Sequence, residues 1–459
     1  MTGEGKRPMH RVVSLFSGCG GLDVGFRDLG FEILYACDSD PAAVDCYARN
    51  VGKHVYQRDV RDDAFRNDIA AIGGCDVVLG GFPCQGFSKA GPKRSDDQRN
   101  NLYWQMCTTV KRLTPAMFIA ENVDGMSQNY RGSYVRRIRE DFAALGYHVE
   151  CRVLNAAAFG LPQHRRRIFF VGHAESSCVE FAWPTPTHNA TSRNGESPLT
   201  HEFPLFDESP QATLGDGPRK MWPARTIRDA IGDLCDLTST PADHAVTASW
   251  PAQYHSIFQH VGPGQKICNV RNAATSVKTW QIPEVFGPVT EQQVTILDTI
   301  ARHRRHKRYG RRPNGNPIPR SEIDRLLPDL SDIGSDIATL LKAGYLKEVS
   351  DGMFDLKGAM FCSGIFKRPL WDSPSPTVLT NFHNPRYFLH PERHRPFSLR
   401  ECARLQGFSD SFVFQSPVVS LVEGYRLVGN AVPPPMSTLF ASAVQVALRR
   451  LPHSLVASA

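Results

Sequence analysis

Short apolar runs alternate along the first third of the chain with segments whose apolar residues recur at helical spacing. Residues 11–16 form a β-rich run, and a glycine turn over 17–21 leads into a helical pattern that ends at Gly30. Similar strand-and-helix units follow over 32–50, 76–113 and 116–145. This alternation predicts an α/β fold with a mostly parallel, doubly wound, Rossmann-like sheet.

The regular pattern stops near residue 185, where a stretch rich in Ser, Thr, Asn, Gly and Pro begins. This mixed region runs to about residue 370, and apolar helical patterns return from residue 375 onward. We therefore expect residues 1–185 and 371–459 to form one domain, with residues 186–370 as a smaller, mixed domain inserted into it. Within the insert, short helices over 323–327 and 336–341 and a hairpin over 345–356, which turns at residues 351–352, indicate a winged-helix-like element.

Composition narrows the class of protein without indicating a reaction. With 459 residues, 41% of them hydrophobic, the chain can build two or three domain cores. No apolar run approaches the roughly 20 residues of a membrane span, and the polar, basic start lacks a signal-like stretch. We expect a cytoplasmic protein without membrane contact.

The net charge and the cysteine spacing constrain the expected partners and metal sites. The net charge of +7 permits a polyanionic partner but does not require one. None of the 12 cysteines forms the Cys-x2-Cys pair that is typical of zinc sites. We therefore expect no metal site, and we expect most cysteines to be buried as small hydrophobic side chains.

The glycine turn has the features of a nucleotide site. Gly18, Gly20 and Gly21 open a helix after a strand, so backbone N–H groups at the helix start can face a ligand. Asp38 ends the next strand about 20 residues later, where an acidic residue binds ribose hydroxyls. Asp23 replaces the third glycine of the dinucleotide pattern, which favours a nucleoside cofactor without a pyrophosphate. The alternative is a glycine turn that packing alone requires.

Cys84 follows the apolar run 76–80, with glycines on both sides and a proline directly before it. Such a loop suits the close approach of a ligand, and cations downstream favour the thiolate form of the cysteine. These cations are Lys89, Lys93, Arg94 and Arg99. We therefore interpret Cys84 as a nucleophile, the alternative being an ordinary buried cysteine.

An acidic residue and two arginines complete the candidate chemistry. Glu121 ends the apolar run 117–120, at the edge of the predicted sheet where ligands bind in such folds. Burial there would raise the pKa of its carboxyl, and a protonated carboxyl can donate to a ring nitrogen. Arg165 and Arg167 alternate with Arg166, so two guanidinium groups point to one side and suit a phosphate and a carbonyl. The alternatives are an acid that caps the next helix and a solvated basic face.

A run of cations without an acid lies within the insert, and this composition suits contact with phosphate. The run contains Arg302, Arg304, Arg305, Lys307, Arg308, Arg311 and Arg312. A solvated tail is the alternative, which is less expected inside a domain.

Five short motifs in a fixed order resemble those of the DNA cytosine-5 methyltransferase family, of the bacterial restriction-modification type. They are Phe16-x-Gly18-x-Gly20-Gly21, Pro83-Cys84-Gln85, Glu121-Asn122-Val123, Gln163-x-Arg165-x-Arg167 and Gly429-Asn430-x-Val432-Pro433. A single three-residue match would carry little weight, whereas five in order are specific. The resemblance covers almost the whole chain outside residues 185–370.

The resemblance implies S-adenosyl-L-methionine as the methyl donor. It assigns cofactor binding to Phe16, Gly18, Gly20, Gly21, Asp38, Asp59, Pro83, Asn430 and Val432. Within that set it places Asp38 on the ribose and Asp59 near the adenine amino group. Ser39 stands where many members carry an aromatic residue that stacks on adenine, so we expect another residue to cover the ring.

The resemblance also implies a covalent mechanism. The Cys84 thiolate adds to C6 of cytosine, Glu121 stabilises the base through N3, and C5 then takes the methyl group. Arg165 and Arg167 hold the base carbonyl and a nearby phosphate. Because the target atom is out of reach inside a duplex, the base is flipped into the pocket, at a cost of about a few kcal/mol.

Two segments are implied to contact the DNA. Residues 86–101 are expected to close over the flipped base as a mobile lid, and residues 186–370 occupy the target-recognition position of the family. The lid and DNA contacts are assigned to Gln85, Ser88, Lys93, Arg94, Arg99, Gln163, Arg304, Arg305, Lys307 and Arg308.

The implied partners are double-stranded DNA and a functionally paired restriction endonuclease. A monomer suffices, because one active site and one recognition region lie on one chain. Two alternatives stay open: a tRNA cytosine-5 methyltransferase, and a non-catalytic DNA-binding regulator on the same fold. The long insert favours DNA over tRNA, and the presence of every catalytic residue type favours an enzyme.

Overall fold

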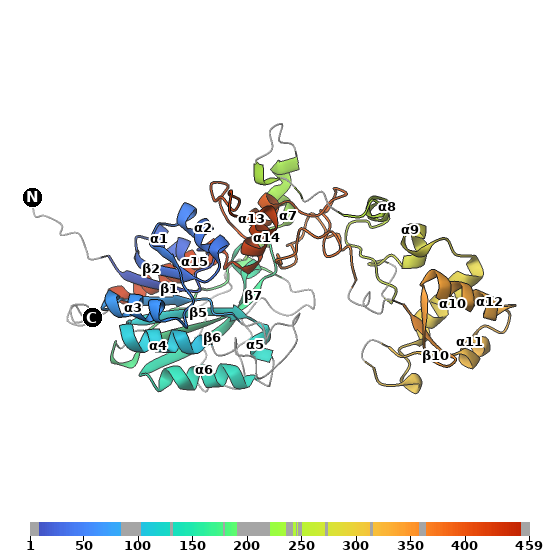
Figure 1. Cartoon of the computed structure of the whole chain (residues 1–459), viewed down its shortest axis with the longest axis horizontal. Coiled ribbons are helices and arrows are strands. Elements are labelled where there is room, and N and C mark those ends of the chain that lie inside the picture. Colours follow the sequence, from blue (N-terminus) through green and yellow to red (C-terminus); the bar gives the residue numbers. More distant parts are fainter. Residues whose placement is uncertain are drawn as a thin grey trace, which may run out of the picture. The chain divides into compact units, whose positions relative to one another are not determined.

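The computed structural model divides the chain into two compact units. The first comprises Met1–Ala245, Asp372–Asn381 and Ser398–Ala459, and the second comprises Val246–Trp371 and Phe382–Phe397 (Figure 1). The structure describes residues 9–83, 102–128, 132–177, 180–190, 221–235, 242–244, 246, 250–270, 274–312, 315–357 and 364–450.

A seven-stranded sheet forms the centre of the first unit, in the order β3-β2-β1-β4-β5-β7-β6. Its strands are β1 (Arg11–Leu15), β2 (Glu32–Asp38), β3 (Val55–Gln57), β4 (Val77–Gly80), β5 (Met117–Val123), β6 (Tyr147–Asn155) and β7 (Arg166–Ala174). The first five strands are parallel, whereas β7 runs antiparallel to both β5 and β6. The predicted α/β class with a mostly parallel, Rossmann-like sheet is confirmed.

Helices cover both faces of this sheet, as a doubly wound fold requires. The helices are α1 (Asp23–Asp28), α2 (Pro41–Asn50), α3 (Asp63–Ile72), α4 (Tyr103–Leu113), α5 (Gly125–Gln128), α6 (Ser133–Ala143) and α15 (Pro434–Arg449). One apolar core lies between the sheet and α1, α2 and α15, and the other lies between the sheet and α3, α4 and α6 (Figure 1). Loops follow the carboxyl ends of β1, β4 and β5.

The last helix completes the layer that α1 begins. The Gly25 N–H donates to Ser437 Oγ at 3.1 Å, and a Cβ on Gly25 would lie 2.3 Å from the Thr438 nitrogen. The Phe440 ring stacks on Phe169 of β7, with centroids 4.4 Å apart. The C-terminal segment therefore packs in the same unit as the first strand.

The boundaries of the insert differ from those expected at residues 186 and 371. Described residues between 221 and 244 belong to the first unit, where Ile227 and Ile231 are buried. Asp243 forms an ion pair with the buried Arg400. A buried guanidinium needs a counter-charge, and this requirement ties residue 243 to the sheet domain. The segment 382–397, in turn, belongs to the second unit.

The remaining elements of the first unit are short. They are β8 (His188–Asn189), β9 (Trp222–Pro223), α7 (Ile227–Ile231), α13 (Leu399–Leu405) and α14 (Leu421–Asn430). Single-turn 3-10 helices in the two units span Ala156–Phe159, Glu175–Ser177, Gly232–Cys235, Ala242–His244, Thr279–Gln281 and Lys307–Tyr309.

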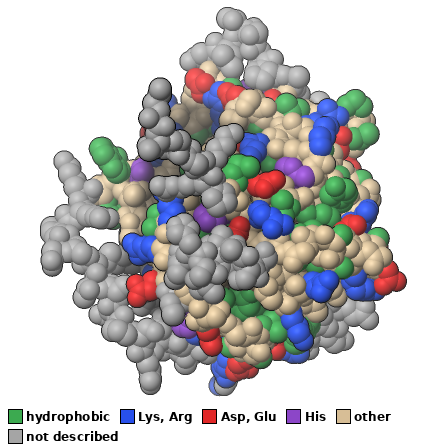
Figure 2. All heavy atoms as spheres, turned by 90° about the vertical axis from the view of Figure 1, so that its left-hand side faces the viewer, with side chains coloured by type: hydrophobic (Ala, Val, Ile, Leu, Met, Phe, Trp, Pro, Cys, Tyr) green, Lys and Arg blue, Asp and Glu red, His purple; other side chains and the backbone are tan. Residues whose placement is uncertain are grey.

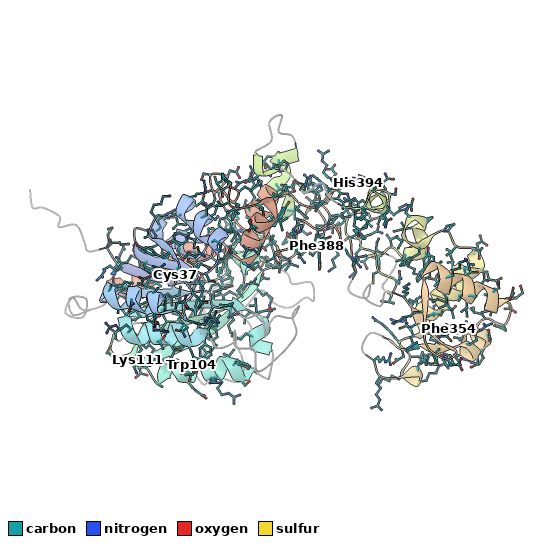
Figure 3. The ribbon with its side chains drawn as sticks, in the orientation of Figure 1. Cys37, Trp104, Lys111, Phe354, Phe388 and His394 are labelled. Atoms are coloured by element: carbon teal, nitrogen blue, oxygen red, sulfur yellow. The ribbon has the colours of Figure 1, made fainter. Side chains whose placement is uncertain are left out.

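The second unit contains small helices and a three-stranded antiparallel sheet in the order β10-β12-β11. Its elements are α8 (Gln253–Gln259), α9 (Pro283–Phe286), α10 (Glu291–His303), β10 (Ile318–Pro319), α11 (Arg320–Leu326), α12 (Ile333–Ala343), β11 (Leu346–Ser350) and β12 (Met353–Leu356). Phe354 of β12 lies in the core that α10, α11 and α12 share (Figure 3). The order α10-β10-α11-α12-β11-β12 is that of a winged helix, as the sequence indicates.

Charged side chains of both signs are scattered over the described part of the face drawn in Figure 2. This distribution agrees with the modest net charge of +7. Within the described ranges, no helix has the length and apolar character that crossing a membrane requires.

Candidate active site

A cavity of about 630 Å³ opens at the carboxyl ends of β1, β2, β4 and β5, where ligands bind in doubly wound folds. Many residues that the sequence singled out line it together. These are Phe16, Gly18, Gly21, Asp38, Pro83, Glu121, Arg167, Asn430 and Val432. Residues of the first, third and fifth motifs, Pro83 of the second and the last arginine of the fourth therefore meet around one space.

Asp38 is fixed at the end of β2 by two backbone donors. The Gly18 N–H donates to its Oδ2 and the Asp40 N–H donates to its Oδ1, each at 2.9 Å. Burial raises the pKa of this carboxyl, and the two backbone hydrogen bonds oppose the rise. Each oxygen keeps a lone pair, so the carboxylate can accept from a ligand hydroxyl.

The backbone beside Asp38 is unusual. Gly18 has φ of 56° and Phe16, at the end of β1, has φ of 54°. A positive φ costs little for glycine, but it strains a phenylalanine. Backbone strain of this kind gathers at ligand-binding sites, which agrees with the position of Phe16 in the cavity wall.

The other two glycines of the turn serve packing. A Cβ on Gly21 would lie 2.3 Å from the Val432 carbonyl oxygen, so its absence lets the closing motif approach. A Cβ on Gly20 would lie 2.5 Å from Val51 Cγ2 of the chain after α2. Gly20 does not line the cavity, and the packing alternative describes it better than ligand contact does.

Glu121 and Arg167 form a buried ion pair at the floor of the cavity. Arg167 Nε lies 2.9 Å from Glu121 Oε1, yet within the described residues Oε1 accepts no well-aligned hydrogen bond. Burial raises the pKa of Glu121, while Arg167 and Arg165 oppose the rise. The carboxyl therefore has capacity for a further polar partner.

Asn122 belongs to the acid motif, and the structure shows a structural role for its side chain. Its Nδ2 donates to the Phe82 carbonyl at 3.0 Å, and both residues are buried. The hydrogen bond joins the end of β5 to the segment after β4. It therefore holds the segment that ends at Pro83 beside the end of β5.

Arg165 differs from its expected contact with a base or phosphate. Its guanidinium is 1% exposed and donates to the carbonyls of Val378, Gly429 and Ala431 at 3.2, 3.0 and 2.9 Å. A group so enclosed cannot reach a substrate in this structure. Arg165 supports the closing motif, while Arg167 alone of the pair lines the cavity.

Gln163 is likewise internal and does not face DNA. Its Nε2 donates to the Leu405 carbonyl at 2.9 Å, and its Oε1 accepts from the Val378 N–H at 3.0 Å. The side chain is fully buried. Gln163 therefore ties the arginine motif to α13 and to the segment that precedes it.

Asp59 does not line the cavity, but its partner does. Asp59 forms an ion pair with Arg61, which lines the wall together with Ser39 and Arg426. Arg426 pairs with Asp40 at the same rim. Sequence reasoning missed Arg61 and Arg426, because neither belongs to a motif and their nearness depends on the fold.

The candidate nucleophile and the lid fall outside the described residues. This applies to Cys84, Gln85, Ser88, Lys93, Arg94 and Arg99, and to the segment 86–101. The last described residue before them is Pro83, which lines the cavity.

The four named cations of the insert separate into different environments. Arg304 is 1% exposed and forms two hydrogen bonds with Asp355, at 2.8 and 2.9 Å. This burial contradicts the expected phosphate contact. Arg308 is exposed but pairs with Glu322, whereas Arg305 and Lys307 are exposed and form no ion pair with any described acid.

Comparisons with known proteins agree with this arrangement. The family model of C-5 cytosine-specific DNA methylase matches residues 10–445. The Type II methyltransferase M.AgeI of Thalassovita gelatinovora is 30% identical, covering 95% of this chain and 100% of the relative. M.BanI of Aneurinibacillus aneurinilyticus, also a Type II methyltransferase, is 28% identical over 92% of each chain.

A solved structure shows the same fold. It is that of a prophage-encoded protein (E. coli) described as a DNA modification methyltransferase, with a TM-score of 0.52 and 20% identity. The match covers 96% of this chain and 100% of that one. The tRNA and non-catalytic alternatives are not favoured, because the matching family is defined by DNA methylation. The chain belongs to the C-5 cytosine-specific DNA methylase family and is a DNA (cytosine-5-)-methyltransferase.

Proposed function

We propose that the enzyme methylates a flipped cytosine in a specific double-stranded DNA sequence through a covalent Cys84–C6 adduct. The observation that carries this proposal is one cavity whose wall holds the glycine turn with Asp38 and also the Glu121–Arg167 pair. A methyl donor and a base can therefore meet in it.

S-adenosyl-L-methionine fits the donor side of this cavity. The volume of about 630 Å³ is within the range of about 300–1,000 Å³ that is usual for small-ligand sites. Asp38 would accept from the ribose hydroxyls, and Asn430 and Val432 would close the pocket. Ser39 follows Asp38, so no aromatic side chain at that position would stack on the adenine. Arg61 and Arg426 line the same cavity and would contact the adenine instead. The donor supplies an electrophilic methyl group when it is bound.

The chain's own groups activate the base. The Cys84 thiolate forms a bond to C6, which transfers electron density to C5 and makes C5 nucleophilic. A protonated Glu121 donates to N3, and its raised pKa favours that state. After C5 is methylated, a base removes the C5 proton and the electron pair expels Cys84 as thiolate. The ring regains its aromatic system.

Arg167 has two tasks in this scheme. It holds Glu121 in place through the 2.9 Å ion pair, and its remaining N–H groups can donate to the O2 carbonyl of the base. Arg165 acts indirectly, because it fixes the backbone of Gly429 and Ala431 around Asn430.

The second unit is proposed to read the DNA sequence. Its winged-helix order suits DNA contact, as do the exposed cations Arg305 and Lys307, which pair with no acid in the described part of the chain. Because relatives such as M.AgeI are Type II methyltransferases, we place the enzyme beside a cognate restriction endonuclease, whose cleavage the methyl group would block. One active site and one recognition unit per chain allow it to act as a monomer.

The test is transfer of labelled methyl groups from S-adenosyl-L-methionine to duplex DNA and, separately, to tRNA. We expect label in DNA, none in tRNA, and loss of transfer in Cys84→Ser. Cys107→Ser, at a buried cysteine of α4, is the matched control and should remain active. Transfer that persists in Cys84→Ser would refute the covalent mechanism, and transfer to tRNA alone would refute the substrate.

A further inference from the structure

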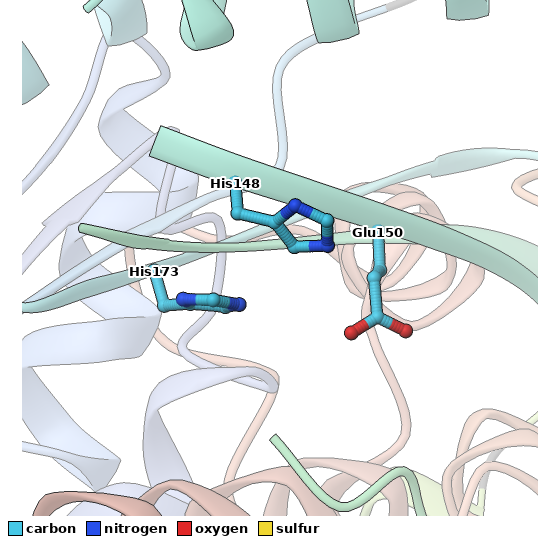
Figure 4. A group of neighbouring side chains, drawn as sticks. All are labelled: His148, Glu150 and His173. Atoms are coloured by element: carbon cyan, nitrogen blue, oxygen red, sulfur yellow. The ribbon is translucent and has the colours of Figure 1, made fainter. Parts of the chain in front are cut away.

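A cluster of two histidines and a glutamate lies on β6 and β7, apart from the catalytic cavity (Figure 4). His148 and Glu150 alternate along β6, so their side chains leave the same face of the sheet. His173 of β7 lies directly opposite His148 in the antiparallel ladder. Register and alternation thus bring the three side chains together without help from a loop.

The ligand atoms of the cluster converge. One nitrogen of each histidine and one oxygen of Glu150 all lie within 4.8 Å of one another. The two rings have centroids 5.0 Å apart and are tilted by 41°. His173 Nδ1 is buried and forms no hydrogen bond with any described residue, although a buried ring nitrogen normally has a partner.

The carboxylate of Glu150 is oriented by its other neighbours. Trp183 Nε1 donates to Glu150 Oε2 at 2.8 Å, and Arg152 Nη2 lies 3.8 Å from the same oxygen. Arg152 also stacks over the Trp183 ring at 5.0 Å. These contacts engage Oε2 and leave Oε1 for a ligand, and metal-binding carboxylates are commonly held in this way.

We propose that His148, Glu150 and His173 bind a divalent transition-metal ion, and that Zn²⁺ is the ion this ligand set favours. Two imidazoles and one carboxylate suit zinc, which also accepts a water in a fourth position. The expectation of no metal site was based only on cysteine spacing. Cysteine spacing could not reveal this cluster, because His148 and His173 lie 25 positions apart and come together only when β6 pairs with β7.

The ion would serve the fold and not the reaction. His173 pairs with Met117 at the start of β5, whereas the cavity lies at the other end of that strand, where Val123 pairs with Arg167. Six residues of β7 separate the two positions, which corresponds to roughly 20 Å. A metal at this place would clip the edge strand β6 to β7.

The test measures zinc bound to the untagged full-length enzyme after equilibrium dialysis. We expect one zinc ion per chain to be lost in both His148→Ala and His173→Ala. His394→Ala is the matched control, because His394 is an exposed histidine outside the cluster (Figure 3). Zinc held by cysteines would be common to all variants, so it cannot produce this difference. Equal zinc content in the wild type and both variants would overturn the proposal.

Two further measurements guard against misfolding of a variant. Added Zn²⁺ should raise the Tm of the wild type and of His394→Ala, but not that of His148→Ala. Trp183→Phe keeps an aromatic ring but removes the donor to Glu150, so zinc affinity should fall about tenfold. Cobalt-loaded wild type should show the visible absorption of a nitrogen- and oxygen-bound ion. If the spectrum showed thiolate ligands only, it would overturn the assignment of the ion to the two histidines and Glu150. This measurement needs no variant.

Discussion

Two of the arginine–carboxylate pairs within the described residues have the same chemistry but serve different purposes. Arg304 and Asp355, in the second unit, have side chains 1% and 6% exposed and share two aligned hydrogen bonds. Arg167 and Glu121, in the first unit, are 16% and 10% exposed and line a cavity. The first pair is saturated, whereas the second retains capacity for a ligand. A buried ion pair indicates a reactive site only when it is incomplete.

Asp23 is another buried carboxylate, and no described cation forms an ion pair with it. It accepts from Ser14 Oγ at 2.8 Å and from the Tyr47 hydroxyl at 2.7 Å. Burial raises the pKa of Asp23 to about 6, although both hydroxyls oppose the rise. Burial thus raises the pKa of both Asp23 and Glu121, and the groups that oppose the rise are hydroxyls at Asp23 and arginines at Glu121.

Glu121→Gln should give the largest effect, because the incomplete pair is the reactive one. We expect methyl transfer to fall by about 10²–10⁴-fold, since an amide cannot exchange a proton with the base. The Tm should fall less than in Arg304→Met, because the amide keeps the shape of the carboxyl group and the Arg167 side chain left without its counter-charge is 16% exposed, against 6% for Asp355. The measurement is single-turnover methyl transfer beside thermal unfolding. Unchanged transfer would show that both pairs are structural.

Arg304→Met should produce the opposite pattern. Removing one partner leaves Asp355 charged and buried, which should cost about 3–5 kcal/mol of stability. Denaturant unfolding measures this, with the exposed neighbour Arg305→Met as a control that should stay within about 0.5 kcal/mol. The double variant Arg304→Met/Asp355→Leu should recover most of the loss. A small effect of Arg304→Met would mean that the pair is not saturated in solution.

Asp23→Asn tests the role of the Asp23 carboxyl group through the pH dependence of the unfolding free energy. Because the folded pKa is near 6 and exceeds the ordinary value of 3.8, the folded state binds the proton more tightly. The stability that the proton confers is present below about pH 4 and is lost as pH rises to about 6, by roughly 3 kcal/mol. The variant should lack this fall in unfolding free energy over that window. Parallel curves for the two proteins would contradict the assignment.

Lys307→Gln should have the smallest effect, which appears only in DNA binding. An unpaired surface cation that contacts a phosphate contributes about one unit to the slope of log affinity against log salt. Arg320→Gln is the matched control, because Asp324 already pairs with Arg320 at 2.8 Å. We expect a shallower slope for Lys307→Gln and a smaller change for the control. Equal slopes would place the DNA elsewhere on the unit.

Local sequence patterns were sufficient to predict the sheet and many of the residues that line the cavity. Strands and helices follow hydrophobic periodicity, and Asp38 and Glu121 end apolar runs that became β2 and β5. Parallel strands bring their carboxyl ends to one edge, so the position of these two side chains could be predicted. The winged-helix order of the second unit followed from the same periodicity.

Long-range packing decided the rest. Arg304 and Arg305 are adjacent in a run of cations, yet one is buried against Asp355 and the other is exposed. Arg165 is enclosed because the closing motif, more than 250 residues later, supplies carbonyls to it. No local pattern carries that information, since burial depends on which distant segment covers a residue. The sequence by itself determined the elements and the ends of strands at which chemistry occurs. Only the tertiary structure decided which charges are satisfied, because a charge is satisfied by neighbours that folding brings to it.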